Sequence, residues 1–155
     1  MTFQRRSHLT EKRTKVIRVT IPSDFAASRE ASQRILEEVE RQGYAPASVF
    51  AIKLAMEECM INAIKHGNKH DCDKRVHIEA RISQDRTQIS VEDEGPGFDR
   101  GCVPDPRCDE NLQKCSGRGI LLIEAYMNSV KWSNHGRRIT IVRMNDPEPF
   151  ACGCK

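Results

Sequence analysis

Residues 54–68 read LAMEECMINAIKHGN, and this stretch decides the fold. Around it, apolar side chains recur at the spacing of one helix face: Val49, Ile52, Met56, Cys59, Met60 and Ala63. Glu58 and Asn62 stand four residues apart, so they stack on a polar edge of the same helix. Such an acid and amide can hold a divalent metal and handle a proton beside it, because Mg²⁺ needs only one or two protein oxygens. Most pairs of this kind, taken alone, are solvated helix surface.

A predicted strand ends in a second motif at residues 93–97, DEGPG. Asp93 shares its parity with the apolar residues of that strand, so its carboxylate leaves the sheet on the core-facing side. Burying it without a partner would be costly, and a ligand donor such as an exocyclic amine would satisfy it. Gly95 and Gly97 allow the backbone to approach a ligand closely. The alternative is a plain Gly/Pro turn between two strands, but residues 101–115 are polar, contain two prolines and show no strand period.

The third motif is Ser116-Gly117-Arg118-Gly119, which opens the apolar run 120–127. The composition of that run predicts a buried helix. A helix N-terminus reached through two glycines presents free N–H groups and a positive dipole end to an anion such as phosphate. A Ser116 N-cap followed by a flexible entry is the alternative interpretation. The sequence contains neither a Walker-type motif nor G-x-G-x-x-G, so the common nucleotide folds are not supported.

The rest of the chain follows strand and helix patterns. Helices are predicted from Phe25, with Ser23 or Asp24 as the cap, and from Pro46 to near Gly67. Strands are predicted over residues 17–22, 76–82 and up to 93, with a closing hairpin over 130–132 and 138–144. Strands that run together with helices segregated among them predict an α+β two-layer sandwich with one sheet face covered.

Together, the three motifs resemble the Bergerat-type ATP-binding fold, a superfamily that includes the histidine kinases. The strings at residues 54–68, 91–99 and 116–120 are similar to those of the anti-sigma-factor serine/threonine kinases, and the resemblance runs from about Val16 to Met144. It implies a two-layer α/β sandwich of the Bergerat type, with a mixed sheet covered by helices on one face. It also implies ATP and Mg²⁺ as cofactors.

The resemblance also implies roles for individual residues. Glu58, not Glu57, is the catalytic base, because it alone stands four residues before Asn62, the Mg²⁺ ligand. Asp93 accepts the adenine amine. The other implied cofactor-binding residues are Lys65, His66, Gly95, Gly97, Phe98, Lys114, Ser116, Gly117, Arg118, Gly119 and Ile120. Residues 99–116 would form an ATP lid that excludes water on closure, and Arg118 or Lys114 would reach the γ-phosphate. A structural role at the helix end is the alternative for His66.

One position departs from the family pattern. Many relatives carry a Thr directly after the glycine of the last hairpin, close to the adenine and its aspartate. Here Gly136 is followed by Arg137, and Thr140 comes further along the strand. The hydroxyl contact to the base therefore has no assigned residue.

Length and composition bound the remaining possibilities. A chain of 155 residues has room for one domain, and we expect a flexible N-terminus (1–14), an ATPase domain (15–145) and a tail (146–155). Interleaved charges and a net charge of only +3 disfavour direct nucleic-acid binding. The sequence shows no apolar run of membrane-spanning length and no signal-peptide core, so we expect a cytoplasmic protein without membrane contact. The seven cysteines lack the paired spacing of zinc sites and are interpreted as reduced thiols, with redox reactivity as the alternative.

Three functions compete. In the first, the chain is a switch kinase that sequesters a sigma factor and phosphorylates a Ser or Thr of a small anti-anti-sigma antagonist. In the second, it is a binding module whose partner affinity is tuned by nucleotide without phosphoryl transfer. The third, a detached histidine-kinase catalytic domain, is disfavoured because no phospho-acceptor helix pair precedes Val16. A homodimer is expected from the family resemblance.

Overall fold

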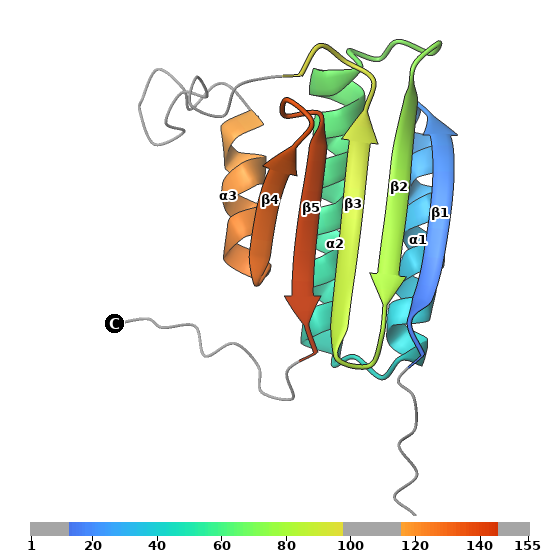
Figure 1. Ribbon diagram of the computed structural model, residues 1–155, viewed down its shortest axis with the longest axis vertical. Helices are drawn as coiled ribbons and strands as arrows, with labels where there is room; N and C mark the ends of the chain where they lie inside the picture. Colours follow the sequence, from blue (N-terminus) through green and yellow to red (C-terminus); the bar gives the residue numbers. More distant parts are fainter. Residues whose placement is uncertain (1–12, 98–115, 146–155) are drawn as a thin grey trace, which may run out of the picture.

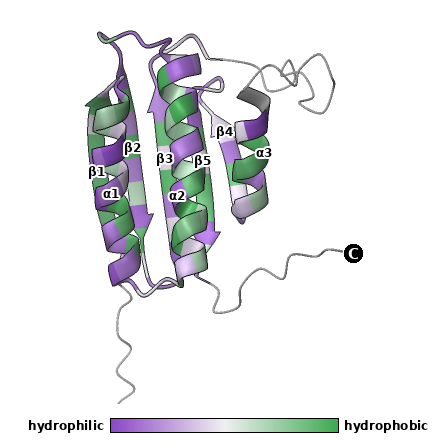
Figure 2. Cartoon of the chain, turned by 180° about the vertical axis from the view of Figure 1, so that it is seen from behind, coloured by the Kyte–Doolittle hydropathy of each residue, from purple (hydrophilic) through white to green (hydrophobic). Residues whose placement is uncertain are grey.

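The computed structural model describes residues 13–97 and 116–145, without the side chains of residues 116 and 117. Five strands form one sheet, and the helices pack on a single face of it (Figures 1 and 2). The strands are β1 (Lys15–Pro22), β2 (Arg75–Ile82), β3 (Arg86–Asp93), β4 (Ser129–Ser133) and β5 (Arg138–Met144). The helices are α1 (Phe25–Arg41), α2 (Pro46–Ile61) and α3 (Ser116–Tyr126), and a π-helical turn, η1 (Asn62–Gly67), continues α2. The predicted two-layer α/β sandwich is confirmed.

The sheet is antiparallel at every neighbouring pair, in the order β1-β2-β3-β5-β4. The expectation of a mixed sheet is therefore wrong. Two helices, α1 and α2, separate β1 from β2, so the chain re-enters the sheet in the opposite direction. One helix of the described residues, α3, lies between β3 and β4 in the chain, and these two strands do share a direction. They are not neighbours, however, because β5 lies between them (Figure 1).

The ends of α1 and α2 follow from local sequence chemistry. Of the two candidate caps, Asp24 caps α1: its carboxylate accepts from the backbone N–H groups of Ala26 and Ala27, at 3.2 and 3.3 Å. Gly43 takes a φ of +83°, which lets the chain leave α1 at little steric cost. Pro46 then occupies the first turn of α2, where its missing N–H is not needed.

The core lies between the sheet and the buried faces of α1 and α2. Most residues of the predicted α2 face are fully buried: Ile52, Met56, Cys59, Met60 and Ala63. They pack in one core with the apolar side chains of the central strands, for example Ile78, Ile89 and Ile141. Burial strongly raises the pKa of the Cys59 thiol, as expected for a core cysteine that behaves as a small hydrophobe.

Helix α3 is less buried than its composition predicts. Ile123 is fully buried, but Leu121 and Leu122 are 44% and 41% exposed. The reason is position: α3 lies beside α2 at the β4 end of the sheet (Figure 2), so only one of its faces meets the core. Within the described residues, no helix has the length and apolar character needed to cross a membrane.

Asn68 ties the end of η1 to three other segments. It is fully buried, and its Nδ2 donates to Ser23 Oγ (2.8 Å) and to the Arg75 carbonyl (2.9 Å). Its Oδ1 accepts from the backbone N–H of Glu94 at 2.8 Å. One side chain therefore fixes the end of η1 relative to the start of α1, the start of β2 and the segment after β3.

We expect Asn68→Ala to lower the free energy of unfolding by about 2–4 kcal/mol, because it removes three part-buried hydrogen bonds that join separate segments. Asn128→Ala is the matched control: Asn128 is exposed and accepts one bond, from the Met144 N–H, so it should cost less than about 1 kcal/mol. Urea unfolding of both variants measures the difference, and equal losses would contradict the role given to Asn68.

Candidate functional site

The first predicted pair, Glu58 and Asn62, lies where the helix changes its geometry. The backbone N–H of Asn62 still bonds to the Glu58 carbonyl, so the i, i+4 relation holds. From Asn62 onward the turn is π-helical, and the Asn68 N–H reaches back to the Ala63 carbonyl at 2.8 Å. Single π-helical turns inside helices are frequent at functional sites. The sequence pattern did not predict this turn.

Asn62 carries a buried polar atom that has no hydrogen-bond partner among the described residues, namely Nδ2. The oxygen and nitrogen of a side-chain amide can exchange places by a flip, so either atom can occupy that position. A buried amide without a partner is uncommon, since it forfeits the bonds it would make in water. This amide is available to a ligand or metal ion.

Glu58 is half-buried against the first turn of α3. A Cβ added to Gly119 would overlap Glu58 Oε2 and lie 3.3 Å from the carboxyl carbon, so only glycine leaves room there. Burial raises the pKa of the Glu58 carboxyl above its ordinary value, and the adjacent Glu57 raises it further. The structure thus brings the first and third motifs into contact.

Asp93 rests in a cradle made by two glycines. Its Oδ1 accepts from the Gly95 N–H at 2.8 Å. A Cβ on Gly67 would lie 2.6 Å from that oxygen, and a Cβ on Gly95 would lie 2.6 Å from the Gly67 carbonyl carbon. Burial raises the pKa of Asp93, against the opposing effects of the Gly95 bond and the Arg137 charge. The second motif is therefore packed on the end of η1.

The last hairpin closes this end of the site. Gly97 has a φ of +78°, and a Cβ there would overlap the His135 carbonyl oxygen. Thr140 cannot supply a hydroxyl near Asp93, because its Oγ1 lies 2.9 Å from Ser90 Oγ on the open face of the sheet. Arg137 is the hairpin residue that lies next to Asp93.

The remaining predicted residues are spread around this centre. Arg118 is exposed, Gly119 is buried and Ile120 is partly buried. Lys65 lines a groove of about 730 Å³ between α1 and α2, and His66 is largely exposed. Partial burial lowers the pKa of His66 below its ordinary value, and the neighbouring charges of Lys65 and His70 lower it further. The assignment of these five residues to the nucleotide site stays a prediction.

Several predicted site residues lie outside the described part of the chain or have no described side chain. Phe98, Lys114 and the lid at 99–115 lie outside the described residues, and Ser116 and Gly117 belong to α3 without described side chains. Conversely, sequence reasoning missed Gly67 and Asn68 as site residues. Their signal was present in the string KHGN, but a glycine and an asparagine at a helix end are also typical of an ordinary C-cap.

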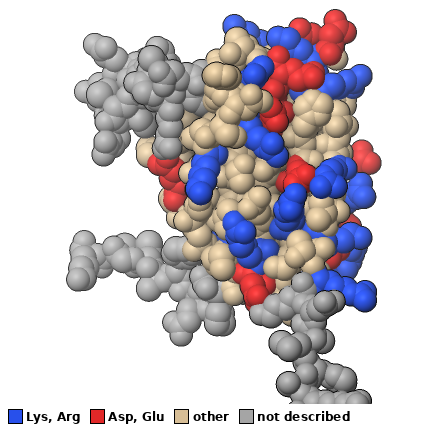
Figure 3. All heavy atoms as spheres, viewed as in Figure 1, with Lys and Arg blue, Asp and Glu red and all other residues tan. Residues whose placement is uncertain are grey.

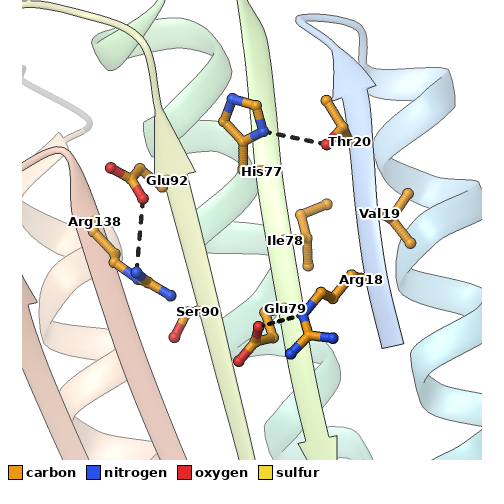
Figure 4. A pocket seen from close by; sticks show the side chains of 9 residues that line it. All are labelled: Arg18, Val19, Thr20, His77, Ile78, Glu79, Ser90, Glu92 and Arg138. Atoms are coloured by element: carbon orange, nitrogen blue, oxygen red, sulfur yellow. Dashed lines mark hydrogen bonds and ion pairs between the residues drawn. The ribbon is translucent and has the colours of Figure 1, made fainter. Parts of the chain in front are cut away.

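The open face of the sheet carries a separate shallow hollow of about 280 Å³ (Figure 4). Its charges are paired: Arg18 with Glu79 at 2.7 Å, and Arg138 with Glu92 at 3.8 Å. Figure 3 shows basic and acidic side chains interleaved over this face. Glu58, Asn62 and Asp93 do not line this hollow, so it is separate from the candidate site.

Comparison with known proteins identifies the family of this domain. The family model of the histidine kinase-like ATPase domain matches residues 21–145, which include Glu58, Asn62, Asp93 and Gly119. The chain belongs to this ATPase family.

Curated relatives of this histidine kinase-like ATPase chain are named as kinases and anti-sigma factors. The serine-protein kinase RsbW of Listeria monocytogenes is 30% identical over 59% of the chain and 62% of the relative, and that of Bacillus subtilis is 30% identical over 61% and 63%. The anti-sigma F factor of Clostridium perfringens is 34% identical over 62% of the chain and 80% of the relative. The match thus spans just under two thirds of the two RsbW kinases. The predicted anti-sigma-factor kinase family is confirmed.

A solved structure supports the fold of this ATPase domain. The crystal structure of the RsbU and RsbW domains of a Mycobacterium tuberculosis protein matches with a TM-score of 0.57 at 18% identity. The match covers 88% of this chain and 34% of the other. At this identity the likeness concerns the fold alone.

We expect Gly119→Ala to keep the ATPase domain folded while it moves Glu58. Ala is favoured over Gly in a helix by up to about 1 kcal/mol, whereas the new methyl group would displace the Glu58 carboxylate. The displaced carboxylate gains water, so its pKa should fall toward its ordinary value. Thermal unfolding and a ¹³C NMR titration of Glu58 measure the two effects.

Leu122→Ala is the control for this change, because Leu122 is an exposed residue of the same helix. It should leave the pKa of Glu58 unchanged. If Gly119→Ala also left that pKa unchanged, the contact between Glu58 and α3 would be refuted.

Proposed function

We propose that this chain is an ATP-dependent serine/threonine kinase that acts as an anti-sigma factor in a partner switch. Its substrate would be a small anti-anti-sigma antagonist, phosphorylated on Ser or Thr, and its second partner a sigma factor. We place the protein in the cytoplasm and expect it to act as a homodimer. The observation that carries the proposal is the half-buried Glu58 carboxylate, held against Gly119 and one helical turn before Asn62.

The site fits ATP and Mg²⁺ on its own features. The unpartnered amide of Asn62 offers one oxygen to a metal ion, which is enough for Mg²⁺ because water and phosphate supply its other ligands. Asp93, which the cradle of Gly67 and Gly95 holds in place, is an acceptor suited to the exocyclic amine of a base. Bound Mg²⁺ would neutralise charge on the phosphates during transfer.

The chain's own groups would orient the substrate and move one proton. Asp93 would accept a hydrogen bond from the exocyclic amine of the base, and the N–H groups at the start of α3 would bind the phosphates. Glu58 receives the proton of the attacking Ser or Thr hydroxyl. Its raised pKa suits this task, because a general base works best when its pKa lies nearer the working pH.

A pure binding module would gain little from this acid. A carboxylate beside the phosphates repels them, and burial adds a desolvation cost. The presence of Glu58 therefore supports transfer to a hydroxyl over nucleotide-tuned binding alone.

The first functional prediction concerns the base pocket. Asp93→Asn should weaken ATP binding by about 1.5–3 kcal/mol, the contribution of a hydrogen bond to a charged group. Glu92→Gln is the matched control, since Glu92 points to the open face and pairs with Arg138. Calorimetry that gave the same affinity for wild type and both variants would remove Asp93 from the pocket.

The second functional prediction separates the metal ligand from the base. Asn62→Ala should impair Mg²⁺-dependent ATP binding, whereas Glu58→Gln should bind ATP but label the antagonist at least ~10²-fold more slowly with γ-labelled ATP. The wild-type rate should fall as the pH drops through the raised pKa of Glu58, because the base must be ionised. Wild-type protein that bound ATP and antagonist without labelling it would leave only the binding module.

A further inference from the structure

Arg137 lies opposite Asp93 across the sheet. The backbone N–H of Asp93 donates to the Arg137 carbonyl at 3.0 Å, so the two residues are direct cross-strand neighbours. Two positions earlier in the register of β3, Val91 and Ile139 form an aligned pair, and both are buried beneath the helices. Because side chains alternate along a strand, Asp93 also points to this helix-covered face, and Arg137, the last residue of the turn before β5, lies opposite it. Arg138 points to the other face, where Figure 4 shows it beside Glu92.

The Arg137 side chain is held in place by the hairpin. Its Nε donates to the Asn134 carbonyl at 3.2 Å, and its Nη2 donates to Asn134 Oδ1 at 3.1 Å. Asn134 Nδ2 in turn donates to Glu92 Oε1. The Arg137 stem also lies against the backbone of Gly97, since a Cβ there would be 3.4 Å from its Cγ. The Arg137 side chain is thus fixed between the hairpin residue Asn134 and the backbone of Gly97.

The charged groups around Asp93 shift its pKa in opposite directions. Gly67, the part of η1 that touches the carboxylate, brings no charge. Glu92 on β3 raises the pKa of Asp93, as burial does, and Arg137 lowers it. Among the charged side chains of the described residues that act on Asp93, Arg137 alone therefore favours the ionised form.

We propose that Arg137 is a positioning residue that sets base specificity, by keeping Asp93 ionised so that it accepts an exocyclic amine. The proposal rests on the proposed nucleotide function of Asp93. An ionised carboxylate accepts from the 6-amino group of adenine and repels the 6-oxo group of guanine. A protonated carboxyl can instead donate to that oxo group. Loss of the Arg137 charge should therefore weaken ATP binding and relax discrimination against GTP.

The test compares Arg137→Gln with Arg137→Lys, which keeps the charge, and Arg138→Gln, which removes the neighbouring charge on the opposite face. In the ligand-free protein, a ¹³C carboxyl NMR titration follows Asp93 directly. We expect Arg137→Gln to raise the pKa of Asp93 by about one unit, the lower end of the effect of an adjacent opposite charge. Arg137→Lys should restore most of the wild-type value, and Arg138→Gln should leave it unchanged.

Calorimetry with ATP and with GTP, between about pH 4 and pH 8, gives the second readout. ATP affinity should be lost as the pH falls through the pKa of Asp93, and in Arg137→Gln this loss should begin about one unit higher. Between the two pKa values, the ATP-to-GTP affinity ratio should fall by up to about tenfold. A purely structural role for Arg137 would lower both affinities equally at every pH.

The outcomes separate the two proposals. An Asp93 pKa that does not move in Arg137→Gln overturns the inference, whether or not ATP binds. A moved pKa with an unchanged pH dependence of ATP binding also overturns it. Wild-type protein that binds neither nucleotide refutes the nucleotide function itself, and the specificity role with it, even if the NMR shift is found.

Discussion

The contact between the Asp93 carboxylate and the Cα of Gly67 joins the two halves of the site. Through this contact the end of β3 packs closely against the π-helical turn that follows α2. A side chain at Gly67 or Gly95 would push these two segments apart. Asn68, the residue after Gly67, then fixes the same junction with bonds to Ser23, Arg75 and Glu94. The two carboxylates of the site, on a helix and on a strand, keep their relative places because this junction is tight.

Burial determines the character of both acids. Desolvation is the largest influence on Glu58 and on Asp93, and in each it favours the neutral form. The opposing influences differ, however. Asp93 has a backbone N–H and an arginine beside it, whereas Glu58 has another acid, Glu57. The environment of Asp93 suits a fixed acceptor, and that of Glu58 suits a group that exchanges a proton.

Periodicity alone predicted much of this arrangement. The parity of Asp93 placed it on the helix-covered face, and the i, i+4 spacing of Glu58 and Asn62 survives in the structure. The π-helical turn was not predictable in this way, because its last residues are held by contacts of Asn68 with segments distant in sequence. The sequence pattern also did not predict that all neighbouring strands are antiparallel, because this depends on the position of β5 between β3 and β4. The position of Arg137 opposite Asp93 became clear only from the register of β5 on β3.

The sheet ends in two strands whose outer edges could recruit further strands. On β1, the exposed charges of Lys15 and Arg18 lie along such an edge, and Pro22 ends the strand with a residue that has no N–H to donate. On the other side, β4 is only five residues long. Short strands, edge charges and proline are the means by which natural sheets avoid pairing with a neighbour's edge. In the part of the sheet that the structure describes, these features disfavour edge-to-edge pairing with a second copy.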